Sequence, residues 1–203
     1  MIILNYQDGI HPLSGKEFKV VDDIVITPFW TEEFCKQLIH VAEICSNKFN
    51  DSIIPGYVQL GWHDLRLDNV SPIFFQDYTQ HYKKDIYPLL VDTFTKESAD
   101  IFGWFPPYII RYNELGQCTG AHNDVSKFTL NIKLNSDYEG CDLTFSRQNF
   151  NAKEVPVGHA MIWPSTITHP HYSTPLISGT KYSFVSWSWP AEWTGSGIKN
   201  LHN

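Results

Sequence analysis

The stretch of the chain that decides the fold runs from Tyr108 to Trp189, and its last part reads GHAMIWPSTITHPHYSTPLISGTKYSFVSWSW (residues 158–189). Short alternating or apolar runs follow one another here, separated by residues that favour turns. These turn positions are Gly116, Gly120, Asn135–Ser136–Asp137, Gly158 and Ser178–Gly179. Regular short strands with such turns predict an antiparallel sandwich or barrel.

The part of the chain before this stretch predicts a strand followed by helices. Lys19 to Ile26 is rich in Val and Ile, which is typical of a strand. Thr31 is suited to cap a helix, and Ser71–Pro72 provides the cap and the first-turn proline of another. Pro88 should break or kink this second helix, and a further helical piece should run to about Ser98.

Because the helices precede the strands, we expect the helices to support one sheet from outside. The predicted fold class is α+β and mainly β, with a jelly-roll or barrel core and N-terminal supporting helices. We expect a single domain over residues 1–203, with helical support over about 27–105 and the β core over about 106–190.

Composition and charge narrow the class of protein. The 203 residues are 42% hydrophobic and 15% aromatic, which suits one globular domain with a sizeable core. The net charge is −7 and no basic stripe occurs, so no nucleic-acid partner is expected. The four cysteines form no C-x-x-C pair and are expected to be reduced thiols. With neither a signal-peptide pattern nor a long apolar window, we expect a soluble, cytoplasmic protein without a membrane partner.

Candidate metal ligands occur twice within the predicted β region. His122 and Asp124 are two residues apart, so on an extended segment both side chains point to one side. A second pair, His169 and His171, follows further along. Two histidines and one carboxylate form the facial triad of non-haem Fe(II) oxygenases, which leaves metal positions open for a co-substrate and O₂. Either histidine of the second pair could complete the set.

The last predicted strand contains a lysine whose environment has two interpretations. Alternation places Lys181 on one face with Val185 and Trp187. As the first residue of the strand, Lys181 could be solvated. Alternatively it points into the barrel, where an anion such as a dicarboxylate reaching from the metal would supply its counter-charge.

The order of these motifs resembles the double-stranded β-helix core of the Fe(II)- and 2-oxoglutarate-dependent dioxygenases, most closely the prolyl 4-hydroxylase branch. The matched stretch, Tyr108 to Trp187, covers about two-fifths of the chain. Its matching elements are Ile109–Tyr112, Gly116, His122–Asp124, Thr129–Asn135, Glu139–Gly140, Gly158–Ala160, Trp163–Ser165, Pro170–His171 with Pro175, and Gly179–Lys181.

This resemblance implies a reaction and assigns residues to it. Fe(II) would be bound by His122, Asp124 and His171, and Lys181 would pair with the distal carboxylate of 2-oxoglutarate. Tyr112 occupies the place of a tyrosine that contacts the co-substrate, although it could be a plain lining aromatic. The reaction would hydroxylate an unactivated C–H bond with O₂ and release succinate and CO₂, with ascorbate as a reductant.

Three further positions are left with two interpretations each. Lys133 stands where the prolyl hydroxylases often have a tyrosine, and it would either join Lys181 in the pocket or face solvent. The proline before His171 and the spacing to Lys181 favour His171 as the ligand, leaving His169 beside the ligands or on the substrate side. Trp187 matches an aromatic at the substrate mouth, and core packing explains it nearly as well.

By analogy, the expected substrate is a prolyl or other residue of a peptide or protein. The segment Pro55 to Asn69, with Trp62 and Arg66, is a candidate rim for it, or else a packed aromatic loop. A free amino acid or another small metabolite is an alternative substrate. A cupin-like metal-binding protein that needs no 2-oxoglutarate is the alternative of a different class. Nothing in the sequence indicates the oligomeric state.

Overall fold

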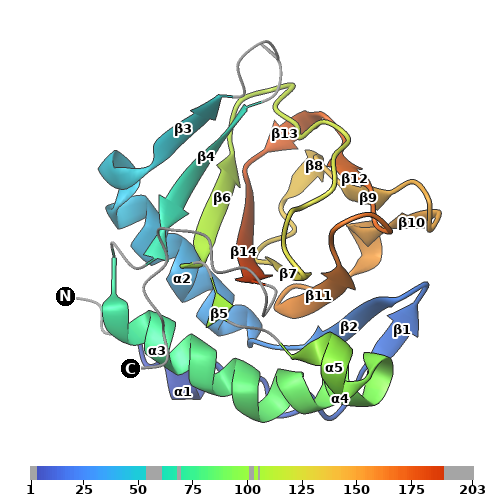
Figure 1. The fold of residues 1–203 in the computed structure, drawn as a ribbon. Helices are drawn as coiled ribbons and strands as arrows, with labels where there is room; N and C mark the ends of the chain where they lie inside the picture. Colours follow the sequence, from blue (N-terminus) through green and yellow to red (C-terminus); the bar gives the residue numbers. More distant parts are fainter. Residues whose placement is uncertain (1–3, 54–60, 68–69, 101–102, 105, 190–203) are drawn as a thin grey trace, which may run out of the picture.

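The computed structural model describes residues 4–53, 61–67, 70–100, 103–104 and 106–189 (Figure 1). Its largest sheet has the strand order β1-β2-β11-β7-β14-β6-β4-β3, and β5 pairs with β14. Neighbouring strands of this sheet are antiparallel. The bounds are β1 (Lys19–Val21), β2 (Ile24–Pro28), β3 (Asn50–Ile53), β4 (Gly61–Arg66), β5 (Gly103–Trp104), β6 (Tyr108–Tyr112), β7 (Phe128–Lys133), β11 (His159–Pro164) and β14 (Lys181–Trp189).

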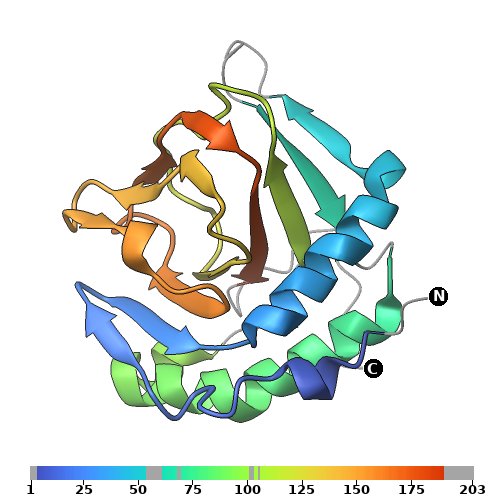
Figure 2. The same cartoon turned by 180° about the vertical axis from the view of Figure 1, so that it is seen from behind.

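Two small antiparallel sheets complete the β core. One has the order β10 (Phe150–Asn151), β9 (Leu143–Phe145) and β12 (His171–Ser173), and the other pairs β13 (Leu176–Gly179) with β8 (Tyr138–Gly140). Residues of β9 and β12 and of β6, β7 and β14 line one cavity, and Tyr138 of β8 and Leu176 of β13 pack with Tyr112 of β6. The small sheets therefore close over the face of the large sheet that the helices leave uncovered (Figures 1 and 2).

The helices form a layer along the other side of the large sheet (Figure 2). Thr31 caps α2 (Glu32–Ile44) and Ser71 caps α3 (Pro72–His81), each by accepting a hydrogen bond from the amide three residues on. A π-helical turn, η3 (Tyr82–Ile86), joins α3 to α4 (Tyr87–Phe94), which contains Pro88. A proline has no amide hydrogen to donate to the carbonyl of the residue four positions earlier. This missing hydrogen bond explains the local change of helix type. The shorter helices are α1 (Tyr6–Gly9), α5 (Lys96–Ala99), η1 (Ser46–Lys48) and η4 (Ala152–Glu154).

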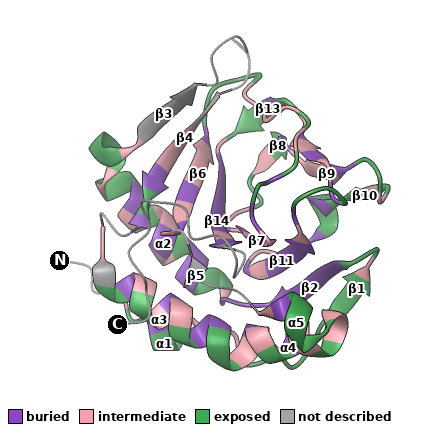
Figure 3. Cartoon of the chain, in the orientation of Figure 1, coloured by how far each residue is buried: buried purple, intermediate pink, exposed green. Residues whose placement is uncertain are grey.

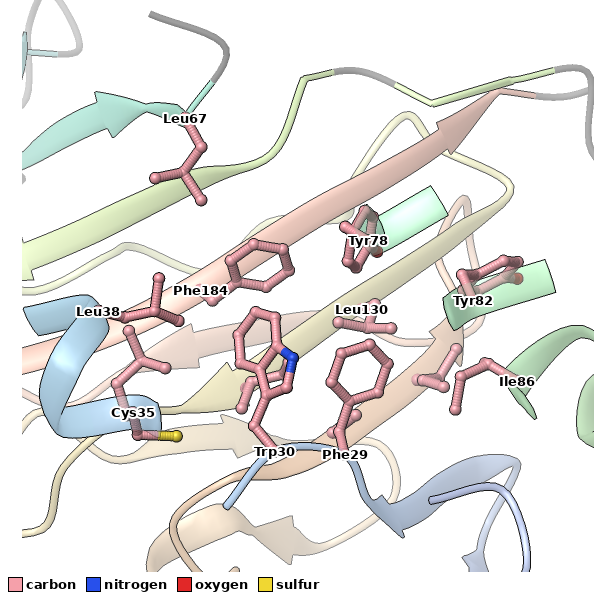
Figure 4. Packing of buried hydrophobic residues seen from close by; sticks show 14 of the residues in the cluster. Phe29, Trp30, Cys35, Leu38, Leu67, Tyr78, Tyr82, Ile86, Leu130 and Phe184 are labelled. Atoms are coloured by element: carbon pink, nitrogen blue, oxygen red, sulfur yellow. The ribbon is translucent and has the colours of Figure 1, made fainter. Parts of the chain in front are cut away.

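Aromatic and aliphatic side chains pack between the helices and the large sheet (Figure 4). Phe184 of β14 is fully buried, with its ring 4.8 Å from the Trp30 ring and 5.2 Å from the Tyr78 ring. Strand β2 is buried along its whole length (Figure 3). In β7, Leu130 and Ile132 point into this core, so their strand neighbours face the cavity on the other side. Alternation along β7 and β14 thus separates the core from the cavity.

The segment predicted as one strand from Lys19 to Ile26 is a hairpin, and this prediction is wrong. The turn between β1 and β2 is formed by Asp22 and Asp23, whose φ angles are 46° and 65°. Aspartate is among the few residues that tolerate a left-handed conformation, so two adjacent aspartates suit such a two-residue turn. The hairpin places the end of β1 beside the loop that follows β11, because the Asp22 carbonyl accepts a hydrogen bond from His169.

The predicted fold class is confirmed: the chain is mainly β with several antiparallel sheets, and its N-terminal half supplies the supporting helices. Each helix within the described ranges is too short or too polar to cross a lipid bilayer.

Candidate metal centre

The structure brings His122, Asp124 and His171 together at one end of the cavity. His122 and Asp124 lie in the loop between β6 and β7, and His171 begins β12. A backbone bridge fixes the two segments, since His122 and His171 exchange hydrogen bonds of 3.0 and 2.9 Å. One ligand atom from each of the three side chains lies within 4.8 Å of the others. Of the two candidate histidines in the second pair, the structure therefore selects His171.

The two histidines are held in one tautomer. Nδ1 of His122 lies 2.8 Å from the Gly120 carbonyl, and Nδ1 of His171 lies 2.9 Å from the His169 carbonyl. A carbonyl oxygen only accepts, so each Nδ1 carries the proton. In the neutral form of each ring, Nε2 therefore has the lone pair. Nε2 of His122 lies 3.4 Å from Oδ1 of Asp124, and Nε2 of His171 lies 3.7 Å from Oδ2. With both rings neutral, this arrangement presents two imidazole nitrogens and a carboxylate to one point, as a divalent ion requires.

The electrostatics of the three side chains also favour a cation between them. Burial raises the pKa of Asp124, but the hydrogen bond to His122, the neighbouring His171 and the hydrogen bond from Thr129 together bring it below its usual value. Burial lowers the pKa of His122, yet the Asp124 hydrogen bond, the Gly120 carbonyl and the Asp124 charge raise it overall. Burial keeps the pKa of His171 below its usual value. The carboxylate is thus ionised and the His171 imidazole is neutral at pH 7.

A cavity of about 230 Å³ extends from these ligands to Lys181. Lys181 is 7% exposed, and its ammonium donates a hydrogen bond of 2.6 Å to the Cys141 carbonyl. Within the described residues this ammonium has no ion-pair partner, although the rings of Tyr112 and Tyr138 lie 5.5 and 5.9 Å away. Burial lowers the pKa of Lys181. The solvated interpretation of Lys181 is therefore wrong, since the strand start is covered by the small sheets.

Tyr112 lines the same cavity, opposite Lys181 in the pairing of β6 with β14. Its hydroxyl lies 2.6 Å from the Thr119 hydroxyl, and the residue is 4% exposed. Burial raises the pKa of Tyr112, so the hydroxyl stays protonated and able to donate. The position agrees with the predicted co-substrate contact, which stays a prediction.

Lys133 and His169 lie elsewhere than a role in the pocket would require. The Lys133 ammonium donates to the Lys153 carbonyl over 2.8 Å at an exposed site, and Lys133 is not among the residues that line the cavity. His169 is buried, with Nε2 3.0 Å from the Asp22 carbonyl and Nδ1 2.8 Å from the Thr168 hydroxyl. Its ring faces the β1–β2 hairpin, so neither a ligand role nor a substrate contact fits it. Instead its own carbonyl holds the ring of His171.

The candidate rim of the cavity is only partly described. Trp187 lines the cavity, and its ring meets that of Tyr108 edge to face at 5.6 Å. The segment predicted as a loop from Pro55 to Asn69 contains strand β4 instead, and positions 54–60 and 68–69 lie outside the described residues. Arg66 is exposed at the end of β4, opposite Tyr108, and Trp62 lies in the same strand.

Several cavity residues escaped the sequence reading. Thr129 and Asn131 of β7 and Tyr108 of β6 all face the cavity. Alternation along β7 puts Thr129 and Asn131 on one polar face, and this pattern is the signal that the sequence offers for them. Whether this polar face of β7 meets solvent or lines a pocket depends on the covering sheet of β9 and β12. That sheet pairs residues that are distant in sequence.

Fold and site together define a class: a jelly roll with a candidate two-histidine, one-carboxylate metal site at one end of a cavity and a buried lysine in its wall. The donor set fits Fe(II), which such triads hold in non-haem oxygenases. A buried ammonium that meets only a neutral carbonyl fits an anionic co-substrate.

Curated relatives point the same way. The chain is 29% identical over 190 residues to procollagen-lysine,2-oxoglutarate 5-dioxygenase 1 of Rattus norvegicus, covering 86% of this chain and 25% of that protein. It is 28% identical over 191 residues to the multifunctional procollagen lysine hydroxylase and glycosyltransferase of Caenorhabditis elegans, covering 88% and 26%. The chain thus spans about a quarter of the length of these relatives. A scan against protein-family models returns no match.

Solved structures share the fold. A prolyl hydroxylase from Trichoplax adhaerens, in complex with a hypoxia inducible factor peptide, has a TM-score of 0.63 at 15% identity, covering 83% of this chain and 84% of that one. A Pseudomonas putida prolyl-4-hydroxylase has a TM-score of 0.61 at 13% identity, covering 83% and 93%. The predicted resemblance is confirmed: the curated relatives are 2-oxoglutarate-dependent dioxygenases and the structural neighbours are prolyl hydroxylase-like oxygenases.

Proposed function

We propose that this protein is an Fe(II)- and 2-oxoglutarate-dependent dioxygenase that hydroxylates a residue of a peptide or protein. The observation that carries the proposal is a single cavity with His122, Asp124 and His171 at one end and the buried Lys181 ammonium in its wall. A metal-binding protein of the cupin type has no need of a buried cation there. The largest of three hydrophobic clusters joins the helices to the large sheet, which supports a single catalytic domain.

Each group in the cavity has a defined task. The Nε2 atoms of His122 and His171 and the Asp124 carboxylate would hold the iron. With 2-oxoglutarate and O₂, the bound iron supplies the oxidising power to hydroxylate an unactivated C–H bond, while 2-oxoglutarate becomes succinate and CO₂. Lys181 would pair with the distal carboxylate of the co-substrate and so hold its orientation. The protonated Tyr112 hydroxyl would donate to the same molecule.

The walls of the cavity separate the reacting atoms from bulk water. Trp163 and Trp187 line it together with Val185 and Leu143, so apolar surface surrounds the polar groups. Beside such apolar surface, hydrogen bonds and charges act more strongly than in bulk water. The half-exposed His122 and the exposed Val125 mark the side from which a substrate residue would enter.

For the substrate, a lysyl residue in a collagen-like peptide is the first choice and a prolyl residue the second. Relatives named for procollagen lysine match over 86% of the chain, which supports lysine. The prolyl hydroxylases share the fold at much lower identity. Four free cysteines support a reducing compartment such as the cytoplasm.

The test is to incubate purified protein with Fe(II), 2-oxoglutarate, ascorbate and collagen-like peptides that contain lysine, proline or neither. We expect succinate release together with the gain of one oxygen atom by the peptide, located on one residue by mass spectrometry. Asp124→Ala should abolish both. Full turnover in folded Asp124→Ala would refute the assignment of the site. Turnover with free amino acids alone would move the substrate to a small metabolite.

A further inference from the structure

We propose that Thr129 is a positioning residue that holds the Asp124 carboxylate so that one oxygen, Oδ1, is left for the metal. This inference rests on the proposed function, since it concerns how the same site binds its ion. It assigns a task to a cavity threonine that acts on the metal through Asp124.

The Thr129 hydroxyl donates a hydrogen bond of 2.6 Å to Oδ2 of Asp124. Thr129 is 1% exposed and Asp124 is 6% exposed, so water does not compete for this contact. A hydrogen bond to an ionised carboxylate is shorter and stronger than one between neutral groups. Oδ2, which lies 3.7 Å from Nε2 of His171, already accepts the Thr129 proton, whereas Oδ1 lies 3.4 Å from Nε2 of His122 and accepts no hydrogen bond from Thr129.

Two serines supply the hydroxyl of Thr129 with donors of their own. Ser126 and Ser165 lie 2.9 and 2.8 Å from Oγ1 of Thr129, and they are 1% and 0% exposed. A threonine hydroxyl has one proton, and an ionised carboxylate accepts only. The proton of Thr129 therefore points to Asp124, and the Ser126 hydroxyl is placed to donate to Thr129. The Ser165 proton is shared between Thr129 and the Trp163 carbonyl, which lies 3.3 Å from the Ser165 hydroxyl. Such a chain of hydroxyls polarises each member and strengthens the last bond.

The backbone of Thr129 is held in place by two neighbouring strands. It lies in the middle of the large sheet, paired with Trp163 on β11 and with Trp187 on β14. Its branched side chain has few rotamers in a strand. Asp124, by contrast, lies in a loop, so its carboxylate depends on side-chain contacts for its orientation. Through its hydrogen bond, Thr129 thus restricts the orientation of the Asp124 carboxylate, which the loop alone would not fix.

The experiment compares Co(II) binding to the full chain and to three variants, with Co(II) as a spectroscopic stand-in for Fe(II). Thr129→Val keeps the shape and removes the donor, Thr129→Ser restores the donor, and Thr27→Val makes the same change at a buried threonine in β2 whose hydroxyl donates to Glu17. Thermal unfolding without metal checks that each variant folds.

We expect Thr129→Val to weaken Co(II) binding about 10- to 100-fold, the usual effect of removing a partner of a metal ligand. The visible bands of bound Co(II) should also change, because the carboxylate coordinates differently. Thr129→Ser should recover affinity and spectrum, and Thr27→Val should retain both. Unchanged affinity and bands in folded Thr129→Val would overturn the inference while leaving the metal site intact.

A measurement on the unaltered chain covers the case in which Thr129→Val does not fold. Aspartate labelled with ¹³C at the carboxylate gives an infrared difference spectrum between metal-loaded and metal-free protein. The separation of its two carboxylate stretches should be that of a one-oxygen ligand. The separation of a two-oxygen chelate would overturn the inference. Failure of the unaltered chain to bind Co(II) at all would instead refute the proposed function.

Discussion

Replacing Lys181 by Met should separate the stability of the protein from its function. The Lys181 ammonium is buried, meets a neutral carbonyl and has a lowered pKa because of burial. Burying such a charge costs several kcal/mol, and apolar replacements of buried charges stabilise proteins by about 1–4 kcal/mol. Losing the hydrogen bond to the Cys141 carbonyl costs about 1 kcal/mol. The net expectation is a gain of roughly 0–3 kcal/mol in the free energy of unfolding without co-substrate.

Binding of 2-oxoglutarate should change in the opposite direction. Removing one partner of a buried, hydrogen-bonded charge pair costs about 2–5 kcal/mol, so the dissociation constant should rise about 30-fold or more. A protein that keeps a destabilising charge at its site exchanges stability for binding. The one Lys181 ammonium thus accounts for both the higher stability and the weaker 2-oxoglutarate binding of Lys181→Met.

The assay is urea unfolding and calorimetric titration of 2-oxoglutarate into anaerobic, Fe(II)-loaded protein. Lys133→Met is the matched control, because Lys133 lies on the neighbouring strand but bonds to the Lys153 carbonyl outside the cavity. We expect the control to bind 2-oxoglutarate like the unaltered chain. Equal losses of binding in both variants, or destabilisation by Lys181→Met, would refute the reasoning.

Three further predictions concern the scaffold. Burial lowers the pKa of His81 to about 4 from a usual 6.5, so the unfolded chain takes up a proton first as pH falls. The free energy of unfolding should therefore drop by up to ~3 kcal/mol between about pH 6.5 and 4. Urea titrations should show this pH dependence in the unaltered chain and its absence in His81→Asn. Phe184→Ala should cost about 3–5 kcal/mol by leaving a cavity beside Trp30, and an unchanged urea midpoint would count against the packing described. Gly158→Ala should cost at least about 2 kcal/mol, since φ is +78° and the new Cβ would lie 2.1 Å from the Trp30 carbonyl oxygen; a melting temperature equal to that of the unaltered chain would exclude this geometry.

Much of the architecture was predictable because it follows from local chemistry. Thr31 and Ser71 cap their helices as predicted, since a hydroxyl at that position satisfies an amide that has no other partner. Alternation correctly grouped Lys181 with Val185 and Trp187, because successive strand residues face opposite sides of a sheet. His122 and Asp124 do lie together as their spacing predicted, although they belong to the loop between β6 and β7 and not to a strand.

The rest depended on contacts between distant segments. Whether Lys181 meets solvent or a cavity is decided by Cys141 and by Tyr138 of β8, and no local pattern reveals that these residues pack on it. His169 and His171 are two residues apart, yet one ring bonds to the Asp22 carbonyl and the other faces Asp124. Lys133 shares a strand face with cavity residues but reaches the Lys153 carbonyl at its end. A long side chain near the end of a strand is free to choose its partner outside the pocket.

The most direct test of the central claim is the visible absorption spectrum of the protein with Fe(II) and 2-oxoglutarate under anaerobic conditions. Chelation of an iron held by His122, Asp124 and His171 predicts a weak metal-to-ligand charge-transfer band. This band should be absent from Asp124→Ala and lost or weakened in Lys181→Ala, with circular dichroism confirming that both are folded. A folded, iron-loaded chain that shows no band would contradict the dioxygenase assignment and favour a cupin-like metal-binding protein.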